Sequence, residues 1–239
     1  MNFVMSIFKA SDNIPACYQY IEHHQKMLKK YNAAHITSSH SDWIENEHTY
    51  LLLVQSNQDS TLLGGARIQI RSSSLLLPVE KALKDCQENL LSKVSLSFHR
   101  VAELCGVWFK FNKNAIGCGF SSIQLIRSAI AIAPMLQIDR LLAFCSPTTF
   151  PLCLNTGGQV VRTIGDQGKL LYPNEDVVST LVLYDDLVNL KHAHKQEKEL
   201  IFNLRQSSFN SITSKGILGE GTLHYDLNQL AETVMLEAV

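Results

Sequence analysis

The stretch that decides the fold is Asn114-Ala-Ile-Gly117-Cys-Gly119. It follows residues 101–111, which have the character of a strand, and precedes residues 120–136, whose apolar positions recur at helical spacing. A chain that leaves a strand through a glycine-bearing loop and opens a helix presents N–H groups without partners inside the helix. The helix dipole adds about half a positive charge there. The stretch therefore predicts a cradle for a phosphate or diphosphate.

Outward from this loop, the chain alternates between strands and helices. Strands are predicted at residues 1–10, 48–55, 61–71, 101–111, 140–145, 159–164 and 177–184, and helices at 13–32, 78–97, 120–136, 148–155, 190–206 and 226–238. A polar turn separates the second and third strands, which predicts a hairpin. A Ser/Gly-rich linker is predicted near residues 207–222. This order indicates a mixed α/β domain with too few βα units for an eight-fold barrel.

The loop differs from two common nucleotide-binding loops. It lacks the third glycine of G-x-G-x-x-G and lies far from the first βα turn, which disfavours a dinucleotide-binding domain. No Gly-Lys-Ser/Thr follows it, so the triphosphate-binding loop is also disfavoured.

Composition narrows the class of protein. The chain has 239 residues, of which 46% are hydrophobic and 18% are charged, as expected for a globular protein with a sizeable core. The net charge is −1 and the basic residues are scattered, which argues against nucleic acid or an anionic membrane as partner. No apolar run is long enough to span a bilayer. The N-terminus lacks the pattern of a secretory signal, so a cytoplasmic location is expected.

Cysteine and histidine spacing gives no metal site. The six cysteines include no CxxC pair and are expected to be buried small side chains in a reducing compartment. His23 and His24 are adjacent, and His192 and His194 are two apart, so neither pair lies on one helical face. We expect these histidines to be solvated and the protein to use no metal.

Over residues 1–186, the chain resembles the GNAT superfamily of N-acyltransferases. The family's diphosphate loop reads Gln/Arg-x-x-Gly-x-Gly/Ala; Gly117 and Gly119 match it, and Asn114 departs from it. A hairpin precedes the loop, and a strand, Ser146-Pro147 and a short helix follow the next helix. The resemblance implies a mixed, mostly antiparallel sheet with splayed central parallel strands and helices on both faces. Residues 187–239 are expected to form a helical extension packed on that domain.

The resemblance also implies an acyl-CoA site. In the family, amides exposed where the fourth and fifth strands diverge pair with the pantetheine arm, which implies this role for Val107, Trp108 and Phe109. The implied diphosphate-binding residues are Asn114, Ile116, Gly117, Cys118, Gly119, Phe120 and Ser121. The expected co-substrate is acetyl-CoA or another acyl-CoA. From the residues alone, the two glycines can equally form a tight βα turn.

Glu103 is the candidate general base. In strand geometry it shares one face with Cys105, Val107 and Phe109. A carboxylate in an apolar strand is costly unless it is wet, paired or protonated, and burial would raise its pKa toward neutrality. Some superfamily members, including histone acetyltransferases, carry the general base at a similar position. The alternative is a carboxylate that makes a structural hydrogen bond.

The resemblance implies direct attack of a primary amine on the thioester, with a strand amide near Val107 stabilising the oxyanion. The family often supplies a tyrosine after the fifth strand to protonate the leaving thiolate. This chain has no tyrosine there, so Ser146, Thr148, Thr149 or a water would take that role. Ser146 is therefore the second catalytic candidate.

The acyl chain and acceptor are open between two subfamilies. Simple N-acetyltransferases use acetyl-CoA, whereas N-acyl amino acid and acyl-homoserine-lactone synthases use longer chains, often from acyl carrier protein. Arg67 and the segment Leu77-Pro78-Val79-Glu80 resemble the synthases, and Arg67 is the candidate substrate-binding residue. The Ser-Arg pair that follows the synthases' glutamate is absent here, and Arg67 can alternatively be a structural ion-pair partner.

A third possibility is a non-catalytic acyl-CoA-binding module of the same fold. Asn114 and the absent tyrosine favour it. The partners considered are a small-molecule amine, acyl carrier protein and a second copy of the chain.

Overall fold

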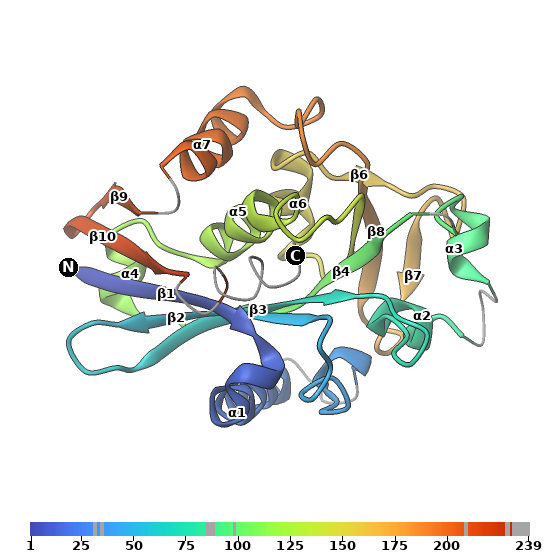
Figure 1. The fold of residues 1–239 in the computed structure, drawn as a ribbon, viewed down its shortest axis with the longest axis horizontal. Coiled ribbons are helices and arrows are strands. Elements are labelled where there is room, and N and C mark those ends of the chain that lie inside the picture. The colour runs from blue at the N-terminus through green and yellow to red at the C-terminus, as the bar shows by residue number, and fades with distance from the viewer. Residues whose placement is uncertain are drawn as a thin grey trace, which may run out of the picture.

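The computed structural model describes residues 1–30, 33, 36–84, 89–97, 99–207, 210–227 and 230. Within these residues, ten strands form one mixed sheet in the order β6-β8-β5-β4-β3-β2-β1-β10-β9, and β7 pairs with β8 (Figure 1). The strands are β1 (Asn2–Lys9), β2 (Thr49–Ser56), β3 (Leu62–Ile70), β4 (Val101–Phe109), β5 (Arg140–Cys145), β6 (Gln159–Val160), β7 (Lys169–Leu171), β8 (Val178–Tyr184), β9 (Ser211–Gly216) and β10 (Gly219–Asp226). The predicted mixed, mostly antiparallel fold class is confirmed, because only β1–β10 and β4–β5 pair in parallel.

Helices cover both faces of the sheet. The helices are α1 (Ile14–Lys30), α2 (Pro78–Ala82), α3 (Leu90–Lys93), α4 (Lys113–Gly117), α5 (Ser122–Ile132), α6 (Phe150–Asn155) and α7 (Lys195–Gln206). Figure 1 shows α1 on one face and α5, α6 and α7 on the other. The core is accordingly divided: one buried cluster lies between α5 and the sheet, and a second lies under α1.

β2 and β3 form a hairpin, as predicted, and β3 lies at the middle of the sheet. Every residue of β3 is buried, because β3 lies between β2 and β4 and is covered on both faces. Strands buried on both faces read as continuous apolar runs, and β3 follows this rule except at Arg67 and Gln69. Those two polar residues alternate along β3 and therefore share one face.

Helix α1 turns an unexpected side toward the sheet. The Asn13 side chain accepts the N–H of Ala16 at 3.2 Å and satisfies one donor of the first turn. The buried residues are Cys17, Tyr20 and His24, which recur at helical spacing. The prediction that His24 is solvated is wrong, since only 3% of it is exposed.

Helices α5 and α7 pack together on the opposite face. Ser121 and Gln124 form a capping box at the start of α5. The Arg127 guanidinium meets the Glu197 carboxylate with Nε–Oε2 and Nη2–Oε1 distances of 2.6 and 2.7 Å. This bidentate pair fixes α7 against α5.

Three predicted elements differ from the structure. The single helix predicted at 78–97 is two short helices, because the chain turns after Ala82 and Asn89 has a φ of 57°. The strand predicted at 159–164 comprises two residues, and the helix predicted at 190–206 begins at Lys195.

The segment predicted as a linker near 207–222 is instead the hairpin of β9 and β10. β10 pairs in parallel with β1, beginning at Asn2↔Thr222, so the C-terminal part of the chain extends the sheet itself. The prediction of a wholly helical extension is therefore wrong for these residues. Of the predicted helix at 226–238, Asp226 ends β10 and all but residues 227 and 230 of the rest lies outside the described residues. The domain boundary at residue 186 stays a prediction.

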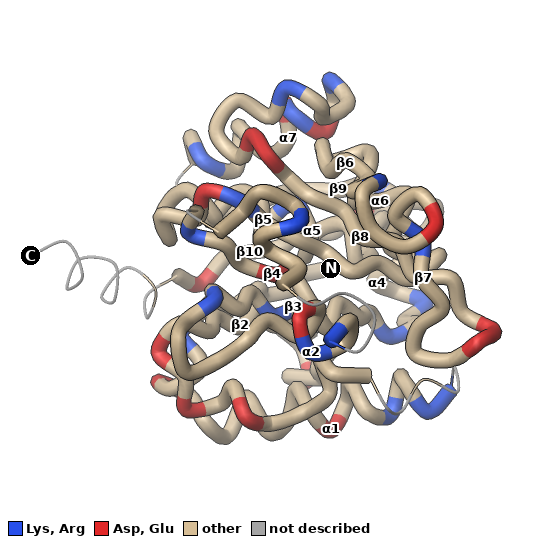
Figure 2. The backbone as a smooth tube through the Cα atoms, turned by 90° about the vertical axis from the view of Figure 1, so that its right-hand side faces the viewer, with Lys and Arg blue, Asp and Glu red and all other residues tan. Residues whose placement is uncertain are grey.

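Lys and Arg, in blue, and Asp and Glu, in red, are interspersed along the backbone drawn in Figure 2. No helix among the described residues is both long and apolar enough to cross a membrane. In the same part of the chain, no cluster of His, Cys, Asp or Glu side chains could hold a metal ion.

Candidate functional site

The two central parallel strands separate after three residue pairs. β4 pairs with β5 from Val101↔Arg140 to Glu103↔Leu142 and no further. Beyond Glu103, β4 continues beside β3 as far as Phe109, and β5 continues beside β8 as far as Cys145. The predicted divergence of these strands is confirmed. It leaves the β5-facing edge of residues 104–109 without a strand partner among the described residues.

A β-bulge in β4 accounts for the divergence. The β3–β4 register passes from Gly65↔Trp108 to Arg67↔Cys105, so two residues of β4 oppose one residue of β3. Gly106 lies at this point with a φ of 57°, in the left-handed region that glycine adopts without strain. A bulge of this kind bends the strand and increases its twist, which turns the end of β4 away from β5.

The bulge also changes the face of the sheet on which the later side chains of β4 lie. Glu103 and Cys105 lie on the face of Arg67, whereas Val107 and Phe109 pack against the buried cluster under α5. Trp108 belongs to the cluster under α1. The prediction that Glu103, Cys105, Val107 and Phe109 share one face is therefore wrong, because strict alternation ends at the extra residue.

Tyr20 closes over the bulge, and this contact gives the first testable prediction. The Tyr20 hydroxyl donates to the Gly106 carbonyl at 2.7 Å, and a Cβ at Gly106 would lie 2.0 Å from the Tyr20 oxygen. Gly106→Ala is expected to lower the free energy of unfolding by about 2–4 kcal/mol, through left-handed strain and overpacking. In a Tyr20→Phe background, the cost of Gly106→Ala should fall by about half, because the overlap is with the hydroxyl. Denaturant unfolding of the four proteins measures this, and equal costs in both backgrounds would contradict the contact.

Glu103 lies where the two strands part. Only 2% of it is exposed, and its Oε2 accepts the backbone N–H of Val79 at 2.7 Å. Burial raises the pKa of Glu103 to about 8, while the Val79 hydrogen bond and the Arg67 charge act in the opposite direction. The carboxyl is therefore poised to exchange a proton near neutral pH.

Arg67 is a buried cation on the same face. It is 1% exposed; its Nε donates to Cys105 Sγ at 3.3 Å, and its guanidinium lies 4.6 Å from the centre of the Trp43 ring. Its Nη1 is buried and has no hydrogen-bond partner among the described residues. A buried guanidinium with an unused donor is costly unless a ligand supplies an acceptor.

The charge of Arg67 acts on the groups around it. Burial raises the pKa of Cys105 to about 12 and raises that of Tyr20 further, and Arg67 moderates both shifts. Burial lowers the pKa of His24 to about 3, and Arg67 adds to this effect. His24 is therefore neutral at physiological pH, and Arg67 is the one fixed positive charge among these groups.

The loop predicted to cradle a diphosphate forms a turn of helix, α4. The Asn112 side chain caps it by accepting the N–H of Ala115 at 3.0 Å. The N–H groups of Ile116, Cys118, Gly119 and Phe120 all donate to carbonyls within residues 112–116. The N–H of Ser121 donates to the Gln124 side chain. These donors are engaged inside the protein and face no open position.

The β9–β10 hairpin packs on this turn. Leu218 N–H donates to the Gly117 carbonyl at 2.8 Å, and a Cβ at Gly117 would lie 2.4 Å from Leu218 Cδ1. A Cβ at Gly119 would lie 2.5 Å from Ser214 Oγ. Both glycines are thus required by close packing against the hairpin, which agrees with the alternative reading of a tight turn.

The other predicted diphosphate-binding residues divide by exposure. Asn114 and Ile116 are exposed, whereas Cys118 and Phe120 are buried in the core. Ser121 is the N-cap of α5.

Ser146 directly follows the last residue of β5. Its hydroxyl contacts the hydroxyls of Thr148 and Thr149 at 2.9 and 3.2 Å. It is four residues beyond Leu142, the partner of Glu103, which is roughly 13 Å along a strand. The structure therefore separates Ser146 from Glu103 and groups it with the two threonines that the sequence also indicated.

The sequence analysis missed three side chains near Arg67. These are Tyr20 and His24 of α1, and Gln69, which pairs with Glu103 and donates to the Leu76 carbonyl at 2.8 Å. Arg67 and Gln69 alternate within an otherwise apolar strand, a period-two signal that could have indicated a polar site. No comparable local signal marks Tyr20 or His24, whose burial depends on how α1 packs.

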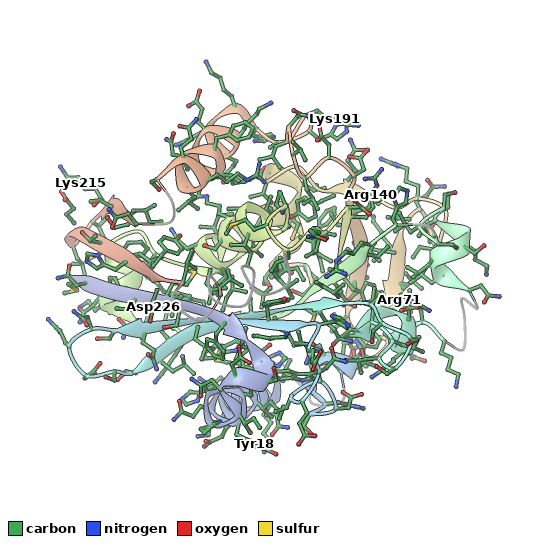
Figure 3. All side chains as sticks on the ribbon, in the orientation of Figure 1. Tyr18, Arg71, Arg140, Lys191, Lys215 and Asp226 are labelled. Carbon is green, nitrogen blue, oxygen red and sulfur yellow. The ribbon has the colours of Figure 1, made fainter. Side chains whose placement is uncertain are left out.

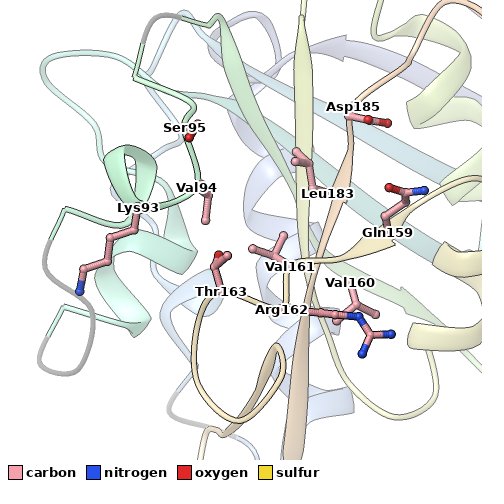
Figure 4. A pocket seen from close by; sticks show the side chains of 10 residues that line it. All are labelled: Lys93, Val94, Ser95, Gln159, Val160, Val161, Arg162, Thr163, Leu183 and Asp185. Carbon is pink, nitrogen blue, oxygen red and sulfur yellow. The ribbon is translucent and has the colours of Figure 1, made fainter.

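Two surface hollows lie elsewhere. One, of about 570 Å³, lies between α1 and residues 39–42 and is lined in part by Tyr18, which projects from α1 in Figure 3. The other, of about 290 Å³, is formed by residues after α3 and by β6 and β8 (Figure 4). Its two cationic residues, Lys93 and Arg162, point away from one another in Figure 4, so their charges do not converge on one position.

Comparison of the sequence with models of protein families gives no match, and comparison with curated proteins gives none either. Solved structures do match. The structure of FeeM, an N-acyl amino acid synthase from uncultured soil microbes, matches with a TM-score of 0.56 and 14% identity, covering 77% of this chain and 92% of that chain.

Two acyl-homoserine lactone synthases are also similar. The CoA-dependent synthase BjaI, solved with SAM and isopentyl-CoA, matches with a TM-score of 0.55 and 12% identity over 98% of this chain and 99% of its own. The synthase LasI matches with a TM-score of 0.50 and 13% identity over 78% and 94%. At these identities, the likeness shows the fold, which is that of GNAT-like N-acyltransferases.

Proposed function

We propose that the protein is an N-acyltransferase that moves an acyl group from an acyl thioester to a primary amine by direct attack. The observation that carries this proposal is the position of Glu103. Its buried carboxyl, with a pKa raised to about 8, lies where β4 and β5 part. A base with a pKa near the working pH is suited to deprotonating an ammonium group.

The residues on the gap have distinct roles in this proposal. Glu103 accepts the proton of the acceptor amine, directly or through a water. The β5-facing edge of β4 near Val107 binds the pantetheine arm by backbone hydrogen bonds and supplies an amide to the oxyanion. Ser146, together with Thr148 and Thr149, donates the proton that the leaving thiolate takes up.

The donor's pantetheine arm fits the structure better than a diphosphate does. Within the part of the chain that the structure describes, the edge of β4 beyond Glu103 has no strand partner, but the amides at 116–121 are already engaged. An acyl carrier protein presents its pantetheine on a single phosphate, whereas acyl-CoA requires the diphosphate to be held. Both acyl carrier protein and acyl-CoA remain in the proposal as donors, and acetyl-CoA is included among the acyl-CoA donors.

The acceptor is proposed to carry a carboxylate beside its amine. Arg67 offers a buried cation with an unused Nη1 on the same face as Glu103. An amino acid would place its carboxylate at Arg67 and its amine toward Glu103. This favours the N-acyl amino acid or acyl-homoserine-lactone type of synthase over a simple N-acetyltransferase.

A non-catalytic acyl-thioester-binding module is the second candidate function. The engagement of the loop amides and the internal hydrogen bonds of Ser146 favour it. We also infer a cytoplasmic location, supported by five free buried cysteines among the described residues.

Thiol release tests the function directly. Acetyl-CoA, decanoyl-CoA and a decanoyl carrier protein are offered as donors, each with a panel of amino acids and their carboxamides. Each amino acid and its amide form a matched pair that differs in the charge read by Arg67. We expect transfer to the amino acid to exceed transfer to its amide by about 10- to 100-fold in kcat/KM, the range of one charged hydrogen bond.

Three outcomes separate the candidates. Equal transfer to the amino acid and to its amide would contradict binding of the acceptor carboxylate by Arg67, but the protein would still be an acyltransferase. Binding of an acyl thioester, seen by native mass spectrometry, without release over the panel would support the binding module. If the protein neither binds an acyl thioester nor releases thiol, both candidate functions are wrong.

A further inference from the structure

The carboxyl of Glu103 is held by the backbone of α2, a helix of five residues. The Val79 N–H donates to Glu103 Oε2 at 2.7 Å, and both residues are buried. Among the described residues, no other donor to this carboxyl lies within hydrogen-bond distance. The placement of one amide in the first turn of α2 therefore decides whether the Glu103 carboxylate is hydrogen-bonded.

That first turn is fixed by the side chain of Glu80. Glu80 Oε2 accepts the N–H of Leu77 at 3.0 Å. Both of its oxygens accept the Nε of Arg71, at 3.1 and 3.2 Å. The Glu80 side chain is only 13% exposed, so this pair is partly shielded from water.

Arg71 is in turn hydrogen-bonded to β4, the strand that carries Glu103. It follows the last residue of β3, and its N–H donates to the Val101 carbonyl at 2.9 Å. It lies beside α2 in Figure 3. These contacts connect two points of β4. Val101 binds Arg71, Arg71 binds Glu80 of α2, and Val79 of α2 binds Glu103.

We propose that Glu80 and Arg71 are positioning residues, whose ion pair fixes the first turn of α2 so that the Val79 N–H points at Glu103. Neither residue touches the reacting atoms. The catalytic meaning of this role rests on the proposed function, in which Glu103 is the base, but the positioning itself does not.

Two effects of Glu80 on Glu103 have opposite signs, which makes the proposal decidable. The negative charge of Glu80 raises the pKa of Glu103, whereas the Val79 hydrogen bond lowers it. If Glu80 acted only through its charge, its removal would lower the pKa of Glu103. If Glu80 positions Val79, its removal raises that pKa, because the carboxylate loses its donor.

The other groups that influence Glu103 are unchanged by substitution at Glu80. They are Arg67 on β3 and Lys81 on α2, which lower the pKa of Glu103. Cys105 on β4, Cys145 on β5 and Tyr172 also interact with its charge. Burial raises the pKa of Cys105 and Tyr172, and the hydrogen bond with Cys153, followed by burial, raises that of Cys145. All three are neutral at physiological pH, so Arg67 and Lys81 are the charges to hold constant.

The test is a pH titration of the Glu103 carboxyl in the ligand-free protein, by NMR of carboxyl-¹³C glutamate, with Glu103→Gln used to assign the signal. Glu80→Ala is expected to raise the pKa of Glu103, with a roughly tenfold change in its ionisation constant. Glu80→Gln, which keeps an acceptor for Leu77 and Arg71, should restore most of the original value. A fall in the pKa of Glu103 in Glu80→Ala, or no change, would overturn the proposal.

Arg71→Gln is the second variant, for the case in which Glu80→Ala does not fold. This variant leaves the Glu80 charge and the Leu77 hydrogen bond in place, so it should raise the pKa of Glu103 by less than Glu80→Ala does. An unchanged or lowered pKa of Glu103 contradicts the positioning role. In the acyl-transfer assay, the raised pKa of Glu103 in these variants should move the dependence of kcat on pH to higher pH, while the KM for the acceptor stays constant. If Glu103→Gln does not affect transfer, Glu103 is not the base, and the NMR titration still decides the positioning.

Discussion

Glu103→Gln is expected to slow acyl transfer by about 10²- to 10⁴-fold at pH 8, the usual contribution of a general base. Glutamine has the shape of glutamate, and its Oε1 can still accept the Val79 N–H, but it cannot take a proton from the amine. The loss should lie in kcat, and the rise of the rate with pH near 8 should disappear. Thiol release followed from pH 6 to 9 measures both.

The same substitution should change how stability depends on pH. In the native protein, burial raises the pKa of Glu103 from 4.5 to about 8, so the folded state keeps a proton that the unfolded state loses. Stability is then lost as pH rises between these values, by up to roughly 1.4 kcal/mol per pH unit from this group. Glu103→Gln should remove this decline.

The exposed Glu199→Gln on α7 is the matched control. It should leave the transfer rate unchanged and alter the free energy of unfolding by less than about 0.5 kcal/mol. An unaltered rate and pH profile in Glu103→Gln would exclude Glu103 as the base. An unaltered pH dependence of unfolding would show that the carboxyl is already ionised in the folded protein at neutral pH.

Arg67→Met is expected to stabilise the ligand-free protein while it removes acceptor recognition. Arg67 is buried, and its Nη1 has no partner in the described part of the chain, so an apolar side chain of similar length should raise the free energy of unfolding by about 1–3 kcal/mol. The KM for an amino acid acceptor should rise about 10- to 100-fold, and that for its carboxamide should change little. Chemical denaturation and steady-state kinetics measure the two effects separately.

Arg140→Met serves as the control for Arg67→Met. Arg140 begins β5, is partly exposed, and donates to the Asp139 carbonyl. Its replacement should shift the free energy of unfolding by less than about 0.5 kcal/mol and leave both acceptors unaffected. If Arg67→Met destabilises the protein and weakens acid and amide acceptors equally, Arg67 has a structural role and does not read a carboxylate.

These expectations share one structural origin, the bulge at Gly106. It turns the end of β4 from β5, and it keeps Glu103 and Cys105 on the face of Arg67 while Val107 and Phe109 pass to the other. A straight β4 could pair with β5 along its whole length and leave no free strand edge. The left-handed φ of Gly106 thus links one residue to the position of Glu103, the proposed base, and to the edge of β4 that does not pair with β5.

Much of the fold could be predicted because local pattern decides it. Arg140–Cys145 has the bounds that its apolar run indicates, and the β2–β3 hairpin follows from two strand patterns joined by a polar turn. The placement of Glu103 and Arg67 on one face does not follow in this way, because it depends on the register between β3 and β4. Periodicity of two or 3.6 residues needs no knowledge of what the element packs against.

Other features depended on signals that are weak in the sequence. A lone glycine inside a strand pattern can mark a bulge, and Gly106 does so, but nothing local excludes an ordinary strand. In the β9–β10 hairpin, β9 alternates between exposed and half-buried positions, and β10 buries only Gly221 and Leu223. It is stabilised by pairing with β1 at the other end of the chain, which no local pattern encodes.

The sequence by itself determined most strands and helices up to residue 184 and the candidacy of Glu103, because these rest on residue types at short spacing. The diverging parallel pair and the candidacy of Arg67 followed from the resemblance to the GNAT superfamily. Only the tertiary structure decided that His24 and Tyr20 are buried beside Arg67, that the loop amides at 116–121 are engaged, and that Val79 supplies the donor to Glu103. The physical reason is that burial and hydrogen-bond partners are set by segments distant in the chain, which meet only when the sheet and its helices pack together.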